Sequence, residues 1–203
     1  LQTGTRRGAF ASGGIGPHDM QLMPDGRTLL VANGGIETHP ETGRAKLNLP
    51  VMQPNLTYLS LDGAVLEQVA PPDAWHKCSL RHLSVRQDGL VAVAGQWQGD
   101  LAQTAPLLAT HRRGRDLMFH PVPDELHRRM RGYAGSVAFS GDGARIGVTG
   151  PRGGVARVFD AKGAVQAALP APEVCGVAAR GNGVIFTTGT GAVFADSRAS
   201  PRM

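Results

Sequence analysis

The chain has 203 residues, 41% of them hydrophobic, so it is long enough to enclose one substantial core. Its 28 glycines and 14 prolines lie between short apolar runs, which excludes a helical bundle and predicts an all-β protein with many turns. The net charge of +5 comes almost entirely from scattered arginines, without a basic helix or a basic stripe interleaved with aromatics, so we expect no nucleic-acid binding.

Pairs of apolar runs joined by a short glycine-containing turn recur along the chain. In chain order these pairs cover 18–33, 81–96, 135–150 and 175–189. An Asp-Gly or Asn-Gly dipeptide between apolar runs is the strongest short signal for a β-hairpin. A second hairpin follows each of the first three pairs, at 56–69, 106–119 and 155–169, and the last copy stops after 191–196. The repeating unit is therefore four strands.

A repeat of four strands predicts the blades of a β-propeller. The turn glycines Gly26, Gly89, Gly143 and Gly183 are 63, 54 and 40 residues apart, close to the roughly 40–50 residues of known blade repeats. One four-stranded sheet cannot bury both of its faces alone, whereas radial stacking buries each face against a neighbouring sheet.

The blades are expected at 14–70, 79–122, 133–170 and 173–196, with a leading strand at 6–10 left over from a preceding blade. The only expected helix is a short one at 123–131, which has proline and acids first and arginines last. Three and a half to four blades do not close a ring. We therefore expect a partial propeller, or a homo-oligomer in which another copy completes the ring.

Propeller geometry sorts the connections between strands onto two faces. The tight turns share one face, and the long connections share the other, where loops held by a rigid scaffold commonly carry function. The connection over 34–55 is far longer than a hairpin needs. We therefore expect the functional face to be the one with the long loops.

Polar residues stand at the start of the expected innermost strands, where they would line the mouth of the central channel. These residues are His18 and Asp19 in the first copy and Arg81 and His82 in the second. Polar groups that converge in a concavity are the usual sign of a binding site. With residues from the long connections added, the candidate ligand-binding set is His18, Asp19, Arg44, Lys46, Arg81, His82, Gln96, Trp97 and Arg152.

Each candidate also has a structural interpretation. His18 and His82 would suit a divalent metal, the only cofactor suggested here, although no H-x-x-x-H or H-E-x-x-H spacing is present. The same histidines could serve as an acid–base pair or simply pin neighbouring blades together. The basic residues could clamp a small anion or be solvated surface charges. Trp97 could be a stacking platform or could pack its own loop.

Several other residues lead to expectations about burial and compartment. Cys78 and Cys175 match neither a disulfide framework nor a zinc spacing, so they are two free thiols or one bridge. We expect Cys175 to be buried and the histidines at 111, 120 and 127 to lie on the surface. No apolar stretch is long enough to span a membrane, and no export signal is present.

Five segments resemble a bacterial propeller family of unknown function. They are G-G-I-G-P-H-D-M, the run from D-G-R-T-L-L-V through G-G-I-E-T-H-P-E-T-G-R-A-K-L-N, S-L-R-H-L-S-V, P-R-G-G and V-C-G-V. The family is similar to WD40 and YVTN propellers. The resemblance implies a periplasmic protein of which this chain is the C-terminal portion, with genes for iron uptake or imelysin-like proteins nearby.

The leading functional hypothesis is a non-enzymatic module that binds a protein partner or a small anionic ligand on the long-loop face. The resemblance adds a link to periplasmic iron or metal handling. One alternative is a metal-assisted hydrolase or lactonase with its site in the channel. The other is an inert fragment of a longer propeller.

Overall fold

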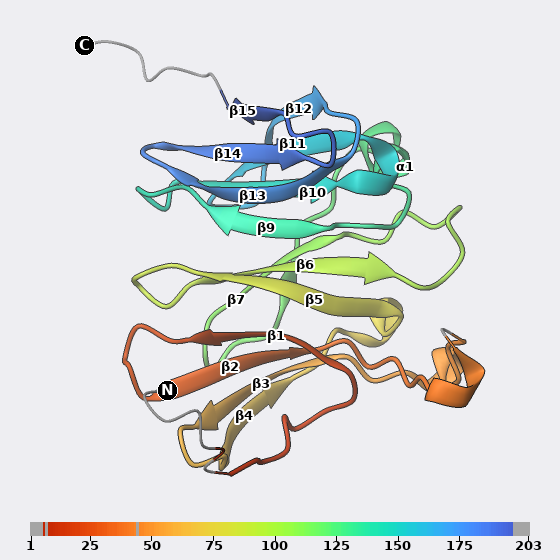
Figure 1. Ribbon diagram of the computed structural model, residues 1–203, viewed down its shortest axis with the longest axis vertical. Helices are drawn as coiled ribbons and strands as arrows, with labels where there is room; N and C mark the ends of the chain where they lie inside the picture. Colours follow the sequence, from red (N-terminus) through yellow and green to blue (C-terminus); the bar gives the residue numbers. More distant parts are fainter. Residues whose placement is uncertain (1–5, 7, 44, 197–203) are drawn as a thin grey trace.

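The computed structural model describes residues 6, 8–43 and 45–196, which form four antiparallel β-sheets stacked along the long axis of the molecule (Figure 1). In every sheet the strands lie side by side in their sequence order. This simple up-and-down arrangement, repeated sheet after sheet, confirms the expected propeller blades.

The strand bounds define the blades. Blade 1 contains β1 (Pro17–Leu22), β2 (Thr28–Asn33), β3 (Asn55–Ser60) and β4 (Val65–Val69). Blade 2 contains β5 (Cys78–Val85), β6 (Val91–Trp97), β7 (Leu108–His111) and β8 (Met118–Phe119). Blade 3 contains β9 (Ser136–Phe139), β10 (Arg145–Gly150), β11 (Val155–Asp160) and β12 (Val165–Pro170). Blade 4 contains β13 (Val174–Arg180), β14 (Gly183–Thr188) and β15 (Val193–Ala195).

The helical segments are short and lie in the connections. The helix α1 (Asp124–Met130) confirms the one helix expected from the sequence. Four 3-10 turns occupy other connections, at η1 (Pro40–Thr42), η2 (Leu49–Val51), η3 (Asp73–Trp75) and η4 (Pro151–Gly153). None of the helices in the described part of the chain is long and apolar enough to cross a membrane.

The connections separate onto two sides as the propeller geometry requires. In Figure 1 the turns that join the two inner strands of each blade lie at the left, and the long connections and α1 lie at the right. Gly26, Gly89 and Gly143 have φ angles of 66°, 81° and 68°, the left-handed conformation that glycine adopts most readily. In the fourth blade the glycine with positive φ is Gly181, not Gly183, which already begins β14.

The hydrophobic core lies between the blades. Leu30 and Tyr58 of blade 1 pack in one buried cluster with Leu80, Val91 and Val93 of blade 2. Equivalent clusters join blade 2 to blade 3 and blade 3 to blade 4. Each sheet is thus held by its neighbours, and the outer faces of blades 1 and 4 have no neighbouring sheet in the described part of the chain.

Three expectations about individual positions were wrong. The described residues of the expected leading strand, 6 and 8–10, have no regular secondary structure, and residue 7 lies outside the described residues. His111, His120 and His127 are buried rather than on the surface, with exposures of 2%, 6% and 3%, because neighbouring elements cover the outer strands and α1. Cys175 is exposed rather than buried, because it lies at an irregularity of β13 in the last blade, and both cysteines are free thiols.

Candidate functional site

Three of the four innermost strands share a β-bulge near their start. In β1, β5 and β13 the pairing register shifts at this point, and the residues skipped in the pairing are His18, Arg81 and Cys175. A bulge redirects a side chain and is common beside functional sites. The positions that the sequence repeat aligned therefore share one structural feature, on the side of the long loops.

A cavity of about 510 Å³ opens beside two of these positions. Blades 1, 2 and 3 and their connections all contribute to its wall. Its lining is Gly16, Pro17, His18, Ile36, Thr38, Gly43, Lys46, Arg81, Gln96, Gln98, Tyr133 and Arg152. Three of these side chains are cationic and none is a carboxylate, so the cavity carries positive charge.

The three cations of the cavity lack acidic partners. Among the described residues, no carboxylate lies within 4.0 Å of the charged groups of Lys46, Arg81 or Arg152. The Nζ atom of Lys46 donates to Oε1 of Gln98. The guanidinium of Arg152 lies 4.5 Å from the centre of the Tyr133 ring. The positive charge of the cavity is thus not neutralised by any described carboxylate.

Arg81 is the most enclosed of the three cations. Its Nε atom is buried and has no hydrogen-bond partner in the described part of the chain, and burial lowers the pKa of its guanidinium. A Cβ atom on Gly34 would lie 2.8 Å from Oγ of Ser79 and 3.2 Å from Nη1 of Arg81. The same Oγ donates to the Gly34 carbonyl at 2.8 Å. A glycine at the start of the long connection therefore lets that connection lie directly against Arg81.

His18 lines the cavity, whereas His82 does not but contacts His18 where blade 1 meets blade 2. Their rings lie edge to face with centroids 4.6 Å apart. Burial lowers the pKa of both imidazoles, and the nearby Arg81 charge lowers both further. The Asp19 charge opposes this effect at both rings. Both histidines therefore favour the neutral form at pH 7.

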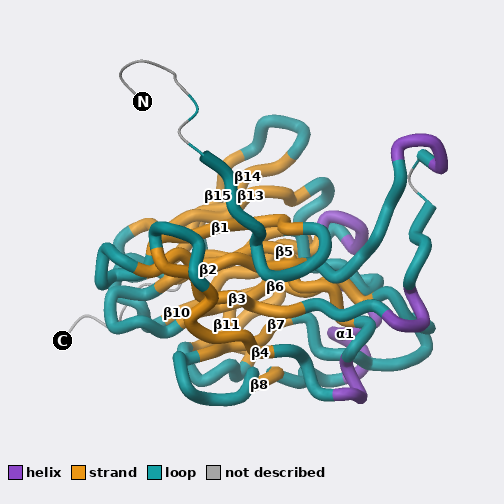
Figure 2. The backbone as a smooth tube through the Cα atoms, turned by 90° about the horizontal axis from the view of Figure 1, so that it is seen from below, coloured by secondary structure: helices purple, strands orange, loops and turns teal. Residues whose placement is uncertain are grey.

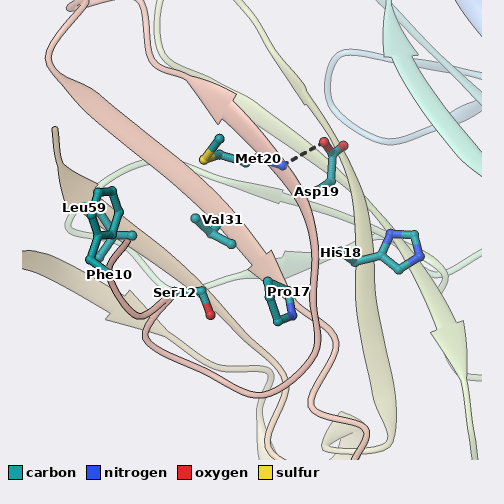
Figure 3. A pocket seen from close by; sticks show the side chains of 8 residues that line it. All are labelled: Phe10, Ser12, Pro17, His18, Asp19, Met20, Val31 and Leu59. Carbon is teal, nitrogen blue, oxygen red and sulfur yellow. Dashed lines mark hydrogen bonds between the residues drawn. The ribbon is translucent and has the colours of Figure 1, made fainter. Parts of the chain in front are cut away.

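Asp19 has a structural partner and does not line the cationic cavity. Its Oδ2 accepts a hydrogen bond from the Leu83 amide of blade 2 at 2.8 Å, and its Oδ1 accepts one from the Met20 amide at 2.8 Å. A second hollow, of about 270 Å³, lies on the outer side of blade 1. Figure 3 shows the side chains that line it, with Phe10 and Leu59 at one end and His18 and Asp19 at the other.

The remaining candidates are placed as follows. Gln96 lines the cavity, whereas Trp97 does not. The Trp97 side chain is 6% exposed, donates from Nε1 to the Asp100 carbonyl at 2.8 Å, and packs against Trp75. Trp97 therefore supports its own loop. Arg44 lies outside the described residues.

The metal interpretation of His18 and His82 stays a prediction. Among the residues that the structure describes, no three His, Cys, Asp or Glu side chains gather closely enough to hold a metal ion.

The sequence reasoning missed several residues of the cavity wall, notably Tyr133, Gln98, Ile36 and Thr38. Tyr133 lies three residues before the innermost strand of blade 3, in the connection that propeller geometry assigns to the long-loop face. Its position could therefore have been inferred. The connection containing Ile36 and Thr38 projects from one side of the molecule (Figure 2), and which of its residues line the cavity is not encoded in any local pattern.

The stacked sheets and the cavity at the mouth of the channel define this chain as part of a β-propeller. The chain belongs to the family described as "Protein of unknown function (DUF1513)", whose model matches residues 2–203. No curated protein matches the chain.

Solved structures with similar folds include proteins of diverse function. Hydrazine synthase from Kuenenia stuttgartiensis has a TM-score of 0.67 and 13% identity, covering 94% of this chain and 61% of that one. The Cps50 (Swd1) β-propeller domain of Myceliophteria thermophila has a TM-score of 0.60 and 13% identity, covering 90% and 54%. A catalytically inactive virginiamycin B lyase from Staphylococcus aureus, solved with quinupristin, has a TM-score of 0.55 and 10% identity, covering 88% and 54%. The chain thus spans 54–61% of these three structures, and the likeness shows the fold alone.

Proposed function

We propose that this chain is a non-enzymatic binding module that holds a small anionic ligand in the cavity at the mouth of the channel. One observation carries the proposal: Lys46, Arg81 and Arg152 line one cavity of about 510 Å³ with no carboxylate in its wall. A volume of about 300–1,000 Å³ is typical of small-molecule sites. Guanidinium groups favour carboxylate and phosphate because their parallel N–H groups match the oxygens of these anions.

The three cations come from different blades, which supports a role in ligand binding over local stabilisation. Lys46 belongs to the long connection of blade 1, Arg81 to β5 of blade 2, and Arg152 to η4 of blade 3. Like charges held near one another repel, so a purely structural arrangement would be expected to include acidic partners. A bound anion would offset this repulsion and join three blades at once.

The proposal also includes a cellular location and a biological role. A periplasmic location and a link to iron or metal handling rest on the resemblance of segments such as G-G-I-E-T-H-P-E-T-G-R-A-K-L-N to a periplasmic propeller family. A WD40-like or YVTN-like origin of the blades rests on the same resemblance. The anion-binding chemistry does not depend on either.

Isothermal titration calorimetry with citrate, succinate, acetate and inorganic phosphate tests the proposal. We expect at least one of these anions to bind, and Arg81→Gln and Arg152→Gln each to weaken its affinity about 10- to 100-fold, the effect of losing a charged hydrogen-bond donor.

Arg180→Gln is the matched control, because Arg180 is an exposed arginine of β13 that does not line the cavity. It should leave the affinity within about twofold of wild type, since a distant exposed charge is largely screened. Binding of none of the four anions, or equal losses in the control and the cavity variants, would refute the proposal.

A further inference from the structure

Arg157 is a buried arginine that does not line the cavity described above, and two of its guanidinium nitrogens have no hydrogen-bond partner among the described residues. It lies in the middle of β11 and is 2% exposed. Its neighbours across the strands are Val148 of β10 and Ala168 of β12. Val155 and Phe159, on the same face of β11, belong to the apolar cluster between blades 2 and 3. The side chain of Arg157 therefore enters an otherwise hydrophobic seam.

The guanidinium of Arg157 has no partner on one whole edge. Its Nε and Nη2 atoms are both buried, and neither makes a hydrogen bond within the described part of the chain. These two nitrogens present parallel N–H groups, a fork that fits one small anion. A buried donor left unpaired is destabilising, and a buried unpaired charge is more so.

No acidic side chain neutralises this charge. Arg157 forms no ion pair with any described carboxylate, and the nearby acids of α1, Asp124 and Glu125, lie 4.0 and 3.5 Å from Arg128 and Arg129 instead. The guanidinium of Arg129 adds positive charge nearby. Burial lowers the pKa of the buried His127 imidazole, and the Arg157 charge lowers it further.

Loss of a proton does not remove the buried charge of Arg157 at neutral pH. Burial, with a smaller effect of Arg129, lowers its pKa to about 10. At pH 7 only about one molecule in a thousand would then carry a neutral Arg157. Arg157 is thus charged at pH 7, and a bound anion would compensate its charge.

We propose that the Nε–Nη2 fork of Arg157 binds a small monovalent inorganic anion, chloride under physiological conditions, in the seam between blades 2 and 3. A monatomic ion accepts both N–H groups at once and needs less room than a polyatomic ligand. It would act as a structural ion that joins the two blades. This site is separate from the channel-mouth cavity and does not depend on its function.

Crystals soaked in sodium bromide test the location, because bromide replaces chloride and scatters anomalously. We expect an anomalous peak within hydrogen-bond reach of Nε and Nη2 of Arg157. Absence of that peak at a bromide concentration that labels other surface sites would overturn the proposal. This measurement uses the wild-type chain, so it does not depend on a variant folding.

Thermal unfolding tests the effect on stability. At constant ionic strength, replacing gluconate by chloride should raise the melting temperature of the wild type by about 3–6 °C, with saturation, as expected when chloride reaches about ten times its dissociation constant. Arg157→Met, which keeps the length of the side chain without the charge, should lose this response. Arg180→Met, an exposed control, should retain it. An equal chloride response in wild type and Arg157→Met would also overturn the proposal.

Discussion

The imidazole rings of His18 and His82 lie edge to face with their centroids 4.6 Å apart, although 64 positions separate them in the sequence. One ring comes from β1 and the other from β5, the innermost strands of two successive blades. Stacking of successive sheets brings these two strands side by side. The channel-mouth site is therefore a product of the repeat.

The paired histidines should make stability sensitive to mild acid. Their pKa values are lowered in the folded chain from 6.5, so the unfolded chain binds protons more readily. The resulting stabilisation is present above about pH 6.5 and is lost as the pH falls through the folded-state values. Urea unfolding between pH 7.5 and 5 should show this loss of stability. In the double variant His18→Gln/His82→Gln, the free energy of unfolding should fall less over the same pH range.

Part of the acid sensitivity should persist in that double variant, because burial also lowers the pKa values of His111, His120 and His127. Equal dependence on pH in the variant and the wild type would show that the His18–His82 pair does not contribute.

Asp19 should contribute to stability through its contact with the next blade. Its Oδ2 accepts from the Leu83 amide at 2.8 Å, a bond between two sheets. Asp19→Ala leaves that amide without its acceptor and should lower the free energy of unfolding by about 1–3 kcal/mol. Asp19→Asn keeps an acceptor oxygen and should lower the free energy of unfolding by less than Asp19→Ala does. Urea denaturation measures both, and no loss in either variant would contradict the assigned role.

Gly163 should tolerate no side chain. Its φ is 87°, and a Cβ atom would lie 1.9 Å from Nδ1 of the buried His120. Gly163→Ala combines a left-handed conformation with this overlap and should destabilise the chain by about 2–5 kcal/mol in urea denaturation.

The matched control is Gly114→Ala. Gly114 has a similar φ of 74°, but nothing lies within 4 Å of its Cβ position. Gly114→Ala should lower the free energy of unfolding by about 1–2 kcal/mol, because only the left-handed conformation disfavours the new side chain. Equal losses in Gly114→Ala and Gly163→Ala would mean that His120 moves aside freely.

The two thiols should react very differently with iodoacetamide. Burial raises the pKa of Cys78 to about 12, whereas Cys175 is exposed. Because the thiolate is the reactive form, mass spectrometry of the native chain at pH 8 should show one modified cysteine, Cys175, and two after unfolding in urea. Cys175→Ser should show none in the native state. Rapid labelling of Cys78 in the folded chain would contradict its burial.

The sequence by itself determined the repeat and much of the site. Asp-Gly turns at Gly26, Gly89 and Gly143 and the alternation of apolar residues act over a few neighbouring residues, so the hairpins follow from local chemistry. Aligning those hairpins was enough to place His18, Arg81 and Cys175 at equivalent positions, and these became equivalent bulges. It also placed Lys46, Gln96 and Arg152 on the face where the cavity opens.

Only the tertiary structure decided what covers each face of each strand. His111 is buried against blade 1, where its ring hydrogen-bonds Tyr58, and Cys175 is exposed in the last blade. Likewise, only the packing of blades 2 and 3 left Arg157 enclosed without a partner. Local periodicity specifies which side chains share a face, whereas burial and charge compensation depend on the sheet that packs against that face, tens of residues away in the chain.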